Sequence, residues 1–163
     1  MRLIGTVLQI LERVTAVAIA ILVALIMVIV VGQLVDRHFV DLPWDAPDQY
    51  ARIAIVWLCF LGSALALSQG ASIRIDLLDH WLPERFVAWR DLLFDLAILG
   101  ILLLLTVKGW TVVKVGSMQV LLGTPFTADV PYAGFLVGSG LAAIFVAIRI
   151  ARRLVGPMPA REK

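Results

Sequence analysis

The sequence of 163 residues is poor in the residues that usually perform chemistry. It has one cysteine, Cys59, and two histidines, His38 and His80. A single cysteine excludes an internal disulfide, and because Cys59 lies in an apolar run we expect it to be a small buried hydrophobic residue. The sequence contains no Walker loop, dinucleotide fingerprint or H-E-x-x-H motif. These absences argue against an enzyme and indicate no catalytic residue, no cofactor and no metal.

Charge is also scarce. Only 16% of the residues are charged, 61% are hydrophobic and the mean hydropathy is +0.98, whereas a soluble domain carries roughly 25% charged residues. A water-soluble chain of this composition could not cover its surface with polar groups. The sequence therefore predicts an integral membrane protein. A net charge of +2 is too small to indicate binding to nucleic acid, which requires basic residues clustered on one face.

Long apolar runs are what the sequence has in place of charge. A bilayer core about 30 Å thick needs about 20 apolar residues per helix. We predict an all-α protein, a single membrane domain over residues 1–163, with transmembrane helices at about 14–35, 50–68, 89–121 and 132–150. The third is long and is expected to tilt, and a break at Gly109 or Gly116 is the alternative. The first is too long for a signal peptide and lacks a clear cleavage site, so we expect it to be retained.

The basic residues predict the orientation in the membrane, because Lys and Arg concentrate in cytoplasmic loops. With the N-terminus in the cytoplasm, ten basic residues lie in cytoplasmic segments and three lie outside. The ten are Arg2, Arg13, Arg74, Arg85, Arg90, Arg149, Arg152, Arg153, Arg161 and Lys163, and the three are Arg37, Lys108 and Lys114. We therefore expect four spans with both termini in the cytoplasm.

The segment between the second and third spans alternates apolar and charged residues at helical spacing. This pattern is typical of a helix lying in the interface plane of the bilayer. We predict a short amphipathic helix over about 73–81, ended before Pro83, which suits the first turn of the next helix. An ordinary charged loop is the alternative. Trp81 and Trp89 are expected at headgroup level, and Arg74 and Asp76 are expected to help anchor the segment.

A few charged residues fall within or beside the predicted spans, where they are costly. Asp48 precedes Arg52 by four residues, so the two could pair on one helical face. Asp95 lies one turn after Asp91, near the inner surface, where it could reach lipid headgroups or pair with Arg90 or with a partner. We favour pairing or interfacial anchoring for these residues over contact with a substrate or a proton.

Small residues provide a helix-packing signal. Gly134 and Gly138 form a G-x-x-x-G motif in the fourth span, and Gly62 and Ser63 add small residues to the second. Small residues let helix backbones approach closely in lipid. The partner could be another helix of the same chain or another protein.

A stretch of about 30 residues carries a resemblance to a known family. Its parts are Asp48-x-x-x-Arg52, then Val56-Trp57-Leu58-x-Phe60-Leu61-Gly62-Ser63-Ala64, then Gly70-x-x-Ile73-Arg74-Ile75-Asp76-Leu77-Leu78. The chain resembles the small membrane subunit of TRAP transporters, the tripartite ATP-independent periplasmic carriers. The family pattern is an acidic residue and an Arg, then V-W-x-x-F-L-G-A-A, then G-x-H-I-x-V-D-x-L. Asp48 stands where Glu is frequent and Ser72 where His is frequent, so a role that needs that His is not expected here.

The resemblance implies a division of labour in the bacterial inner membrane. A periplasmic binding protein captures an organic acid, a large multi-span subunit carries the substrate with an ion, sodium in this family, and the small subunit is a scaffold that helps dock the binding protein. The candidate contact residues are Asp48, Arg52, Trp57, Gly62, Ser63, Gly134 and Gly138. The candidate anchoring residues are Arg74, Asp76, Trp81, Trp89 and Asp95. The alternative is a stand-alone four-helix protein, either a homo-oligomeric exporter with Asp95 at a shared cavity or an assembly factor.

Overall fold

The computed structural model describes residues 2–39, 46–69 and 84–155. Within these ranges the chain forms α1 (Arg2–Phe39), α2 (Pro47–Ser68), α4 (Glu84–Gly116) and α5 (Asp129–Val155). All four helices are long and apolar enough to cross a membrane, and the described ranges contain no β-strand beyond one isolated bridge. This confirms the predicted all-α transmembrane fold. The interfacial helix predicted at 73–81 lies outside the described residues.

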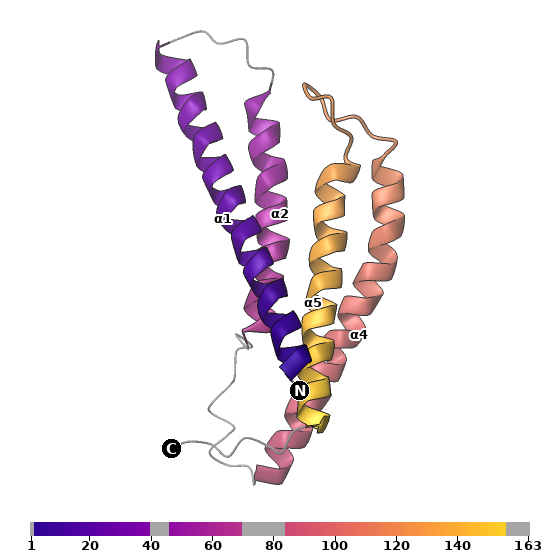
Figure 1. The fold of residues 1–163 in the computed structure, drawn as a ribbon. Helices are drawn as coiled ribbons and strands as arrows, with labels where there is room; N and C mark the ends of the chain where they lie inside the picture. Colours follow the sequence, from indigo (N-terminus) through magenta and orange to yellow (C-terminus); the bar gives the residue numbers. More distant parts are fainter. Residues whose placement is uncertain (1, 40–45, 70–83, 156–163) are drawn as a thin grey trace.

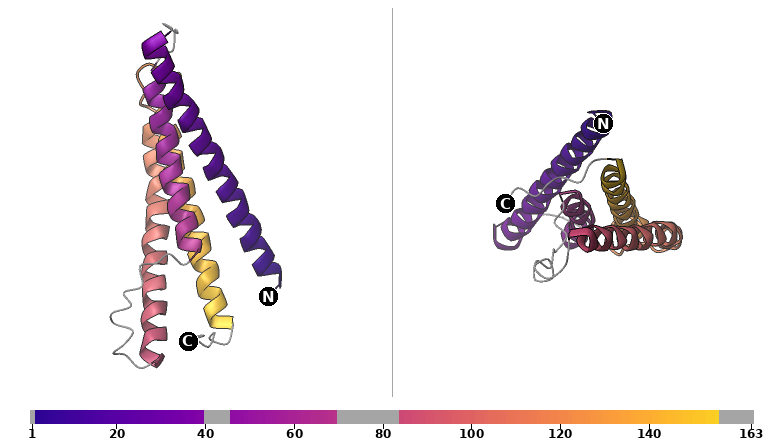
Figure 2. Two further views of the ribbon diagram at one scale, coloured as in Figure 1. Left: turned by 90° about the vertical axis from the view of Figure 1, so that its left-hand side faces the viewer. Right: turned by 90° about the horizontal axis from the view of Figure 1, so that it is seen from below.

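The helices lie in an open row instead of closing into a four-helix bundle. Extensive contacts join α1 to α2, α2 to α5 and α5 to α4, whereas α1 and α5 touch only slightly. The order across the row is therefore α1, α2, α5, α4, as Figure 1 shows from left to right. The N-terminus, the start of α4 and the end of α5 lie at one end of the molecule (Figure 1), and α1 is inclined to the other helices: its upper part stands apart from them in Figure 1 and its N-terminal part in the left view of Figure 2.

The core of the protein lies along α5. In the membrane-spanning part of this helix 44% of the residues are buried, against 6% in α1, 22% in α2 and 11% in α4. Phe145 and Ala142 form a buried cluster with Ala64 of α2, and leucines from all four helices surround it. The helix that is last in the sequence is therefore the one against which α2 and α4 pack.

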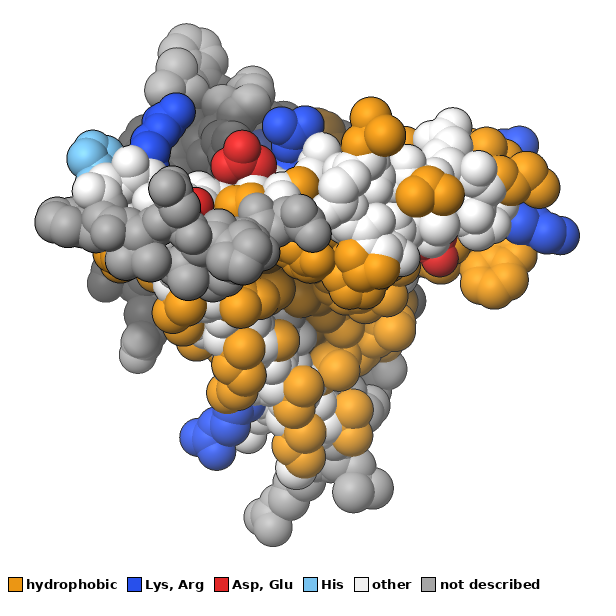
Figure 3. Space-filling model, turned by 90° about the horizontal axis from the view of Figure 1, so that it is seen from above, with side chains coloured by type: hydrophobic (Ala, Val, Ile, Leu, Met, Phe, Trp, Pro, Cys, Tyr) orange, Lys and Arg blue, Asp and Glu red, His pale blue; other side chains and the backbone are white. Residues whose placement is uncertain are grey.

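The remaining surface is hydrophobic. Large apolar side chains are exposed along α1 and α4, for example Val28 at 65% and Val107 at 70%. Seen from above, hydrophobic side chains make up much of the coloured surface, and charged ones are scattered (Figure 3). In a chain that spans a bilayer, such faces contact lipid or another membrane protein.

The third predicted span ends earlier than expected. α4 runs unbroken through Gly109 but stops at Gly116, not at Leu121. A Cβ at position 116 would lie 2.5 Å from the Tyr132 ring, so this glycine is where α4 and α5 converge. The chain then reverses through a turn in which Gly123 has a φ of 80°, a left-handed conformation that glycine adopts readily. The reversal is needed because α5 returns alongside α4.

Candidate functional site

The seam between α2 and α5 is built on the two glycines of the G-x-x-x-G motif. A Cβ at Gly134 would lie 3.0 Å from the Trp57 ring, and a Cβ at Gly138 would lie 2.5 Å from Cβ of Phe60. Both glycines are buried. Of the two partners that the sequence left open for this motif, the structure places a helix of the same chain against it.

Trp57 also ties α2 to the first turn of α5 by a hydrogen bond. Its indole Nε1–H donates to the carbonyl oxygen of Val130 over 3.0 Å. An indole in apolar surroundings needs such a partner, and the side chain lies flat against the surface left open by Gly134. Phe60 continues the seam with an edge-to-face contact to Phe135, the ring centroids being 5.1 Å apart. Trp57, Gly134 and Gly138 therefore take part in packing within the chain.

On the opposite face of α2, none of the helices that the structure describes is packed. Nothing lies within 4 Å of a Cβ built at Gly62, and Ser63 is exposed, its hydroxyl donating to the Cys59 carbonyl oxygen on its own helix. Cys59 is exposed as well, which corrects the expectation that it is buried: it lies on the face of α2 that points away from α5. We call this the outer face of α2, defined by Asp48, Arg52, Ile55, Cys59, Gly62, Ser63 and Ala66.

Asp48 and Arg52 lie at the upper end of the outer face. Both side chains are exposed, and within the described part of the chain no ion pair joins them. The pairing suggested by their spacing of four residues is therefore absent. Exposed pairs of this kind contribute only about 0–1 kcal/mol, so the fold does not depend on it. Both side chains remain available to groups outside the chain.

A network of ion pairs joins α4, α5 and the end of α2. Arg149 Nη2 lies 2.6 Å from Asp95 Oδ1, and Arg149 Nη1 donates to the carbonyl oxygen of Leu67 over 3.0 Å. Arg153 Nη1 lies 3.3 Å from Asp95 Oδ2 and 3.7 Å from Asp91 Oδ2. One carboxylate thus receives two guanidinium groups, and Arg149 connects three helices.

The burial of Asp95 corrects its predicted role. Its side chain is only 6% exposed, so it cannot anchor the helix by reaching lipid headgroups, and it pairs with α5 and not with a second protein. Charges removed from water remain charged only when they are paired and hydrogen-bonded. The sequence carried a signal for this network that we did not use: Asp91 and Asp95 are four residues apart, as are Arg149 and Arg153, at the same end of two antiparallel helices.

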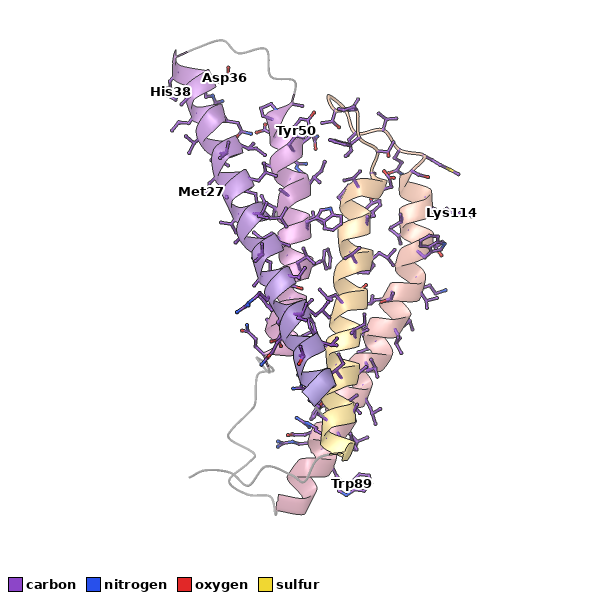
Figure 4. The ribbon with its side chains drawn as sticks, in the orientation of Figure 1. Met27, Asp36, His38, Tyr50, Trp89 and Lys114 are labelled. Atoms are coloured by element: carbon purple, nitrogen blue, oxygen red, sulfur yellow. The ribbon has the colours of Figure 1, made fainter. Side chains whose placement is uncertain are left out.

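Tryptophans mark the depth of α4 in the bilayer. Trp89 and Trp110 are 69% and 66% exposed, and the 21 residue steps from one to the other correspond to about 32 Å of helix at about 1.5 Å per residue. That length matches a hydrocarbon core of about 30 Å bounded by aromatic side chains. Trp89 lies near the lower end of α4, and Lys114 near the upper end (Figure 4). The interfacial position of Trp89 stays a prediction, and Arg74, Asp76 and Trp81 lie outside the described residues.

The described residues offer little for chemistry. They contain no group of three His, Cys, Asp or Glu side chains placed to hold a metal ion. Their main features are the packed seam between α2 and α5, the uncovered outer face of α2, and the network of ion pairs at the lower end of the molecule.

The comparisons with known proteins agree with this picture. The search of the curated proteins found no match. A family model described as the DctQ component of tripartite ATP-independent periplasmic transporters matches residues 26–156. This range covers most of the chain, including α2, α4, α5 and the upper part of α1. The chain belongs to this family, the DctQ components of the tripartite ATP-independent periplasmic transporters.

Proposed function

We propose that this small subunit of a TRAP transporter is a scaffold: it packs against the large transport subunit through the outer face of α2 and helps dock the periplasmic binding protein. Under this proposal the transporter takes up an organic acid together with sodium, and both termini of the small subunit lie in the cytoplasm. Substrate and ion are handled by the large subunit and the binding protein, and this chain holds no site for either.

The observation that carries the proposal is the contrast between the two faces of α2. On one face, side chains of α2 fill the space left by Gly134 and Gly138. On the other face, a Cβ built at Gly62 would meet no atom of another described segment within 4 Å, and Ser63 is exposed. Small residues in lipid permit close approach of another helix, and this chain supplies none at that position. A helix of the large subunit is the partner we infer.

Docking of the binding protein is assigned to the upper end of the outer face. Asp48 and Arg52 are exposed and unpaired with each other within the described residues, and α2 begins at the end of the molecule opposite the N-terminus (Figure 1). With the termini in the cytoplasm, this end faces the periplasm. Opposite charges one helical turn apart can bind a polar rim on a second protein.

The buried polar side chains of the described residues also support a scaffold, because all of them have partners within the chain. The buried polar side chains among the described residues are Thr15, Asp95 and Ser139, and each has a partner: Thr15 donates to a backbone carbonyl, Asp95 is ion-paired, and Ser139 bonds to Leu136 and Thr106. A homo-oligomeric exporter would need Asp95 at a shared cavity. Its pairing with Arg149 and its 6% exposure argue against that alternative.

Co-purification tests the proposal, with two matched variants. The tagged chain is extracted from native membranes in mild detergent, and stoichiometric partners are identified. We expect a large multi-span subunit to co-purify with the wild type and with Gly100→Leu, and to be lost from Gly62→Leu. Both glycines have open space around them within the chain, but only Gly62 lies on the outer face of α2. Equal recovery from both variants would rule out this face as the contact, and a homo-oligomer without a partner would overturn the scaffold role.

A further inference from the structure

A second surface feature lies between α1 and α2, near the start of α1 and the end of α2. It is a pocket of about 620 Å³. Its polar lining includes Gln9, Glu12 and Arg13 from α1 and Gln69 from the end of α2, and its apolar lining includes Ala16 and Leu65. Nothing in the scaffold role requires this pocket, and its residues do not belong to the outer face of α2.

The pocket lies at the depth of the phospholipid headgroups. Between Arg13 and Asp36, α1 has no charged residue, and these 22 residues correspond to about 33 Å of helix, close to the hydrocarbon thickness of about 30 Å. Glu12 and Arg13 therefore mark the lower edge of the apolar part of α1. Gln69 follows directly on Ser68, the last residue of α2, so the polar groups of both helices meet at one level.

The charges in this pocket are opposite and are not paired with each other. Glu12 and Arg13 are neighbours in sequence and both line the pocket. Among the ion pairs and hydrogen bonds of the described residues, neither side chain has a partner. Arg13 is exposed, and Glu12 is half-buried. A carboxylate and a guanidinium side by side, each free to bind outward, suit a ligand that carries both charges.

We propose that this pocket binds a phospholipid whose headgroup contains a phosphate and a primary ammonium, that is, an ethanolamine phospholipid. Arg13 binds the phosphate through its forked N–H donors, and Glu12 accepts hydrogen bonds from the ammonium. The amides of Gln9 and Gln69 donate to the remaining phosphate oxygens. Beside them, Ala16 and Leu65 give an acyl chain an apolar wall between the two helices. The bound lipid would thereby join α1 to α2, its main neighbour in the row.

The test compares headgroups on the purified chain by native mass spectrometry, with matched acyl chains. Ethanolamine and choline phospholipids share the phosphate, but the choline ammonium has no N–H to donate to Glu12. Because a hydrogen bond to a charged group contributes about 1.5–3 kcal/mol, we expect the wild type to bind the ethanolamine lipid about tenfold or more tightly. Equal binding of the two lipids by the wild type would overturn the proposal without any variant.

Three variants assign the selectivity to residues. Glu12→Gln should remove the preference for ethanolamine over choline, because it removes the charge that the ammonium binds. Arg13→Gln should weaken binding of both lipids. Lys114→Gln, which removes one positive charge at the other end of the molecule (Figure 4), should change neither. Selectivity that survives Glu12→Gln would contradict the assignment. If free phosphoethanolamine competes as well as the lipid does at equal concentration, the ligand is a soluble headgroup compound and the lipid proposal fails.

Discussion

Gly138 of α5 lies directly against Phe60 of α2, so closely that a Cβ at position 138 would come within 2.5 Å of the Phe60 Cβ and 2.9 Å of its backbone carbonyl carbon. Backbone and Cβ atoms cannot move aside as the end of a flexible side chain can. The contact therefore fixes the spacing of α2 and α5, on which the middle of the row depends.

Gly138→Ala should destabilise the chain, because the added methyl group must push α2 and α5 apart. We expect a loss of about 1–3 kcal/mol, the usual cost of overpacking, seen as a lower melting temperature of the purified chain in detergent. Gly134→Leu should act in the same direction against Trp57. The matched control is Gly62→Ala, which meets open space and should leave the melting temperature unchanged or slightly raised. An equal effect of Gly138→Ala and Gly62→Ala would contradict the packing at this seam.

Neutralising both Asp95 and Arg149 should cost less stability than the two single neutralisations added together. Asp95→Asn leaves Arg149 without its carboxylate at 2.6 Å, and breaking a buried pair costs about 3–5 kcal/mol. The double variant Asp95→Asn with Arg149→Gln removes both charges, so its loss of thermal stability should be smaller than the sum of the two single losses. Asp48→Asn, on an exposed carboxylate, is the control. Strictly additive losses would show that the two side chains are not coupled.

Trp57→Phe tests how much the hydrogen bond from Trp57 to Val130 contributes to stability. Phenylalanine keeps an aromatic ring against Gly134 but cannot donate to the Val130 carbonyl oxygen. We expect a loss of about 1 kcal/mol in unfolding free energy, typical of one hydrogen bond, measured by denaturation in detergent micelles. Trp110→Phe, at an exposed ring on α4, serves as the control. A wild-type stability for Trp57→Phe would mean that the bond contributes nothing to the seam.

Asp48→Asn and Arg52→Gln should weaken docking of the binding protein without lowering the stability of the isolated chain. Both side chains are exposed and make no ion pair with each other among the described residues, so the melting temperature of the isolated chain should not change. Docking of the binding protein, measured as its retention by the membrane complex, should weaken. Unchanged docking and unchanged uptake for both variants would remove these residues from the contact surface.

Thiol labelling tests the orientation of the chain. In a Cys59→Ser background, Met118→Cys lies in the turn after α4 and Val7→Cys lies near the start of α1, and both positions are exposed. With the termini in the cytoplasm, a membrane-impermeant reagent should label position 118 in intact cells and position 7 only after lysis. The reverse pattern would invert the topology and move Asp48 and Arg52 to the cytoplasmic side.

Much of the fold follows from composition and periodicity, because a bilayer demands apolar helices of a set length. The four helices of the described residues were predicted in this way, and the family was predicted from the motif around Trp57. The predicted end of α4, at about residue 121, was wrong. Residues 117–121 are apolar enough to continue a helix, so composition did not reveal the reversal of the chain, which includes the left-handed conformation of Gly123.

The partners of particular side chains could not be predicted in the same way. Spacing along one helix suggested pairing of Asp48 with Arg52, but those two do not pair, whereas Asp95 pairs with Arg149, which lies on another helix and 54 residues away. Which neighbours meet depends on the order of the helices in the row, and that order is not contained in the pattern of any one span. The exposure of Cys59 has the same origin, because its face of α2 would be buried in a closed bundle.

The central place of α5 has a consequence for how the protein is made. Ribosomes synthesise α5 after the other helices, yet α2 packs against it at the seam, α4 packs along it, and Arg149 bridges it to both. Until synthesis reaches this segment, α1 and α2 can pack against each other, but α4 lacks the described helix with which it makes its extensive contacts. The packing of these helices is therefore complete only after α5 has been synthesised, and a chain truncated before Asp129 would present to the membrane quality-control proteases every surface that α5 normally covers.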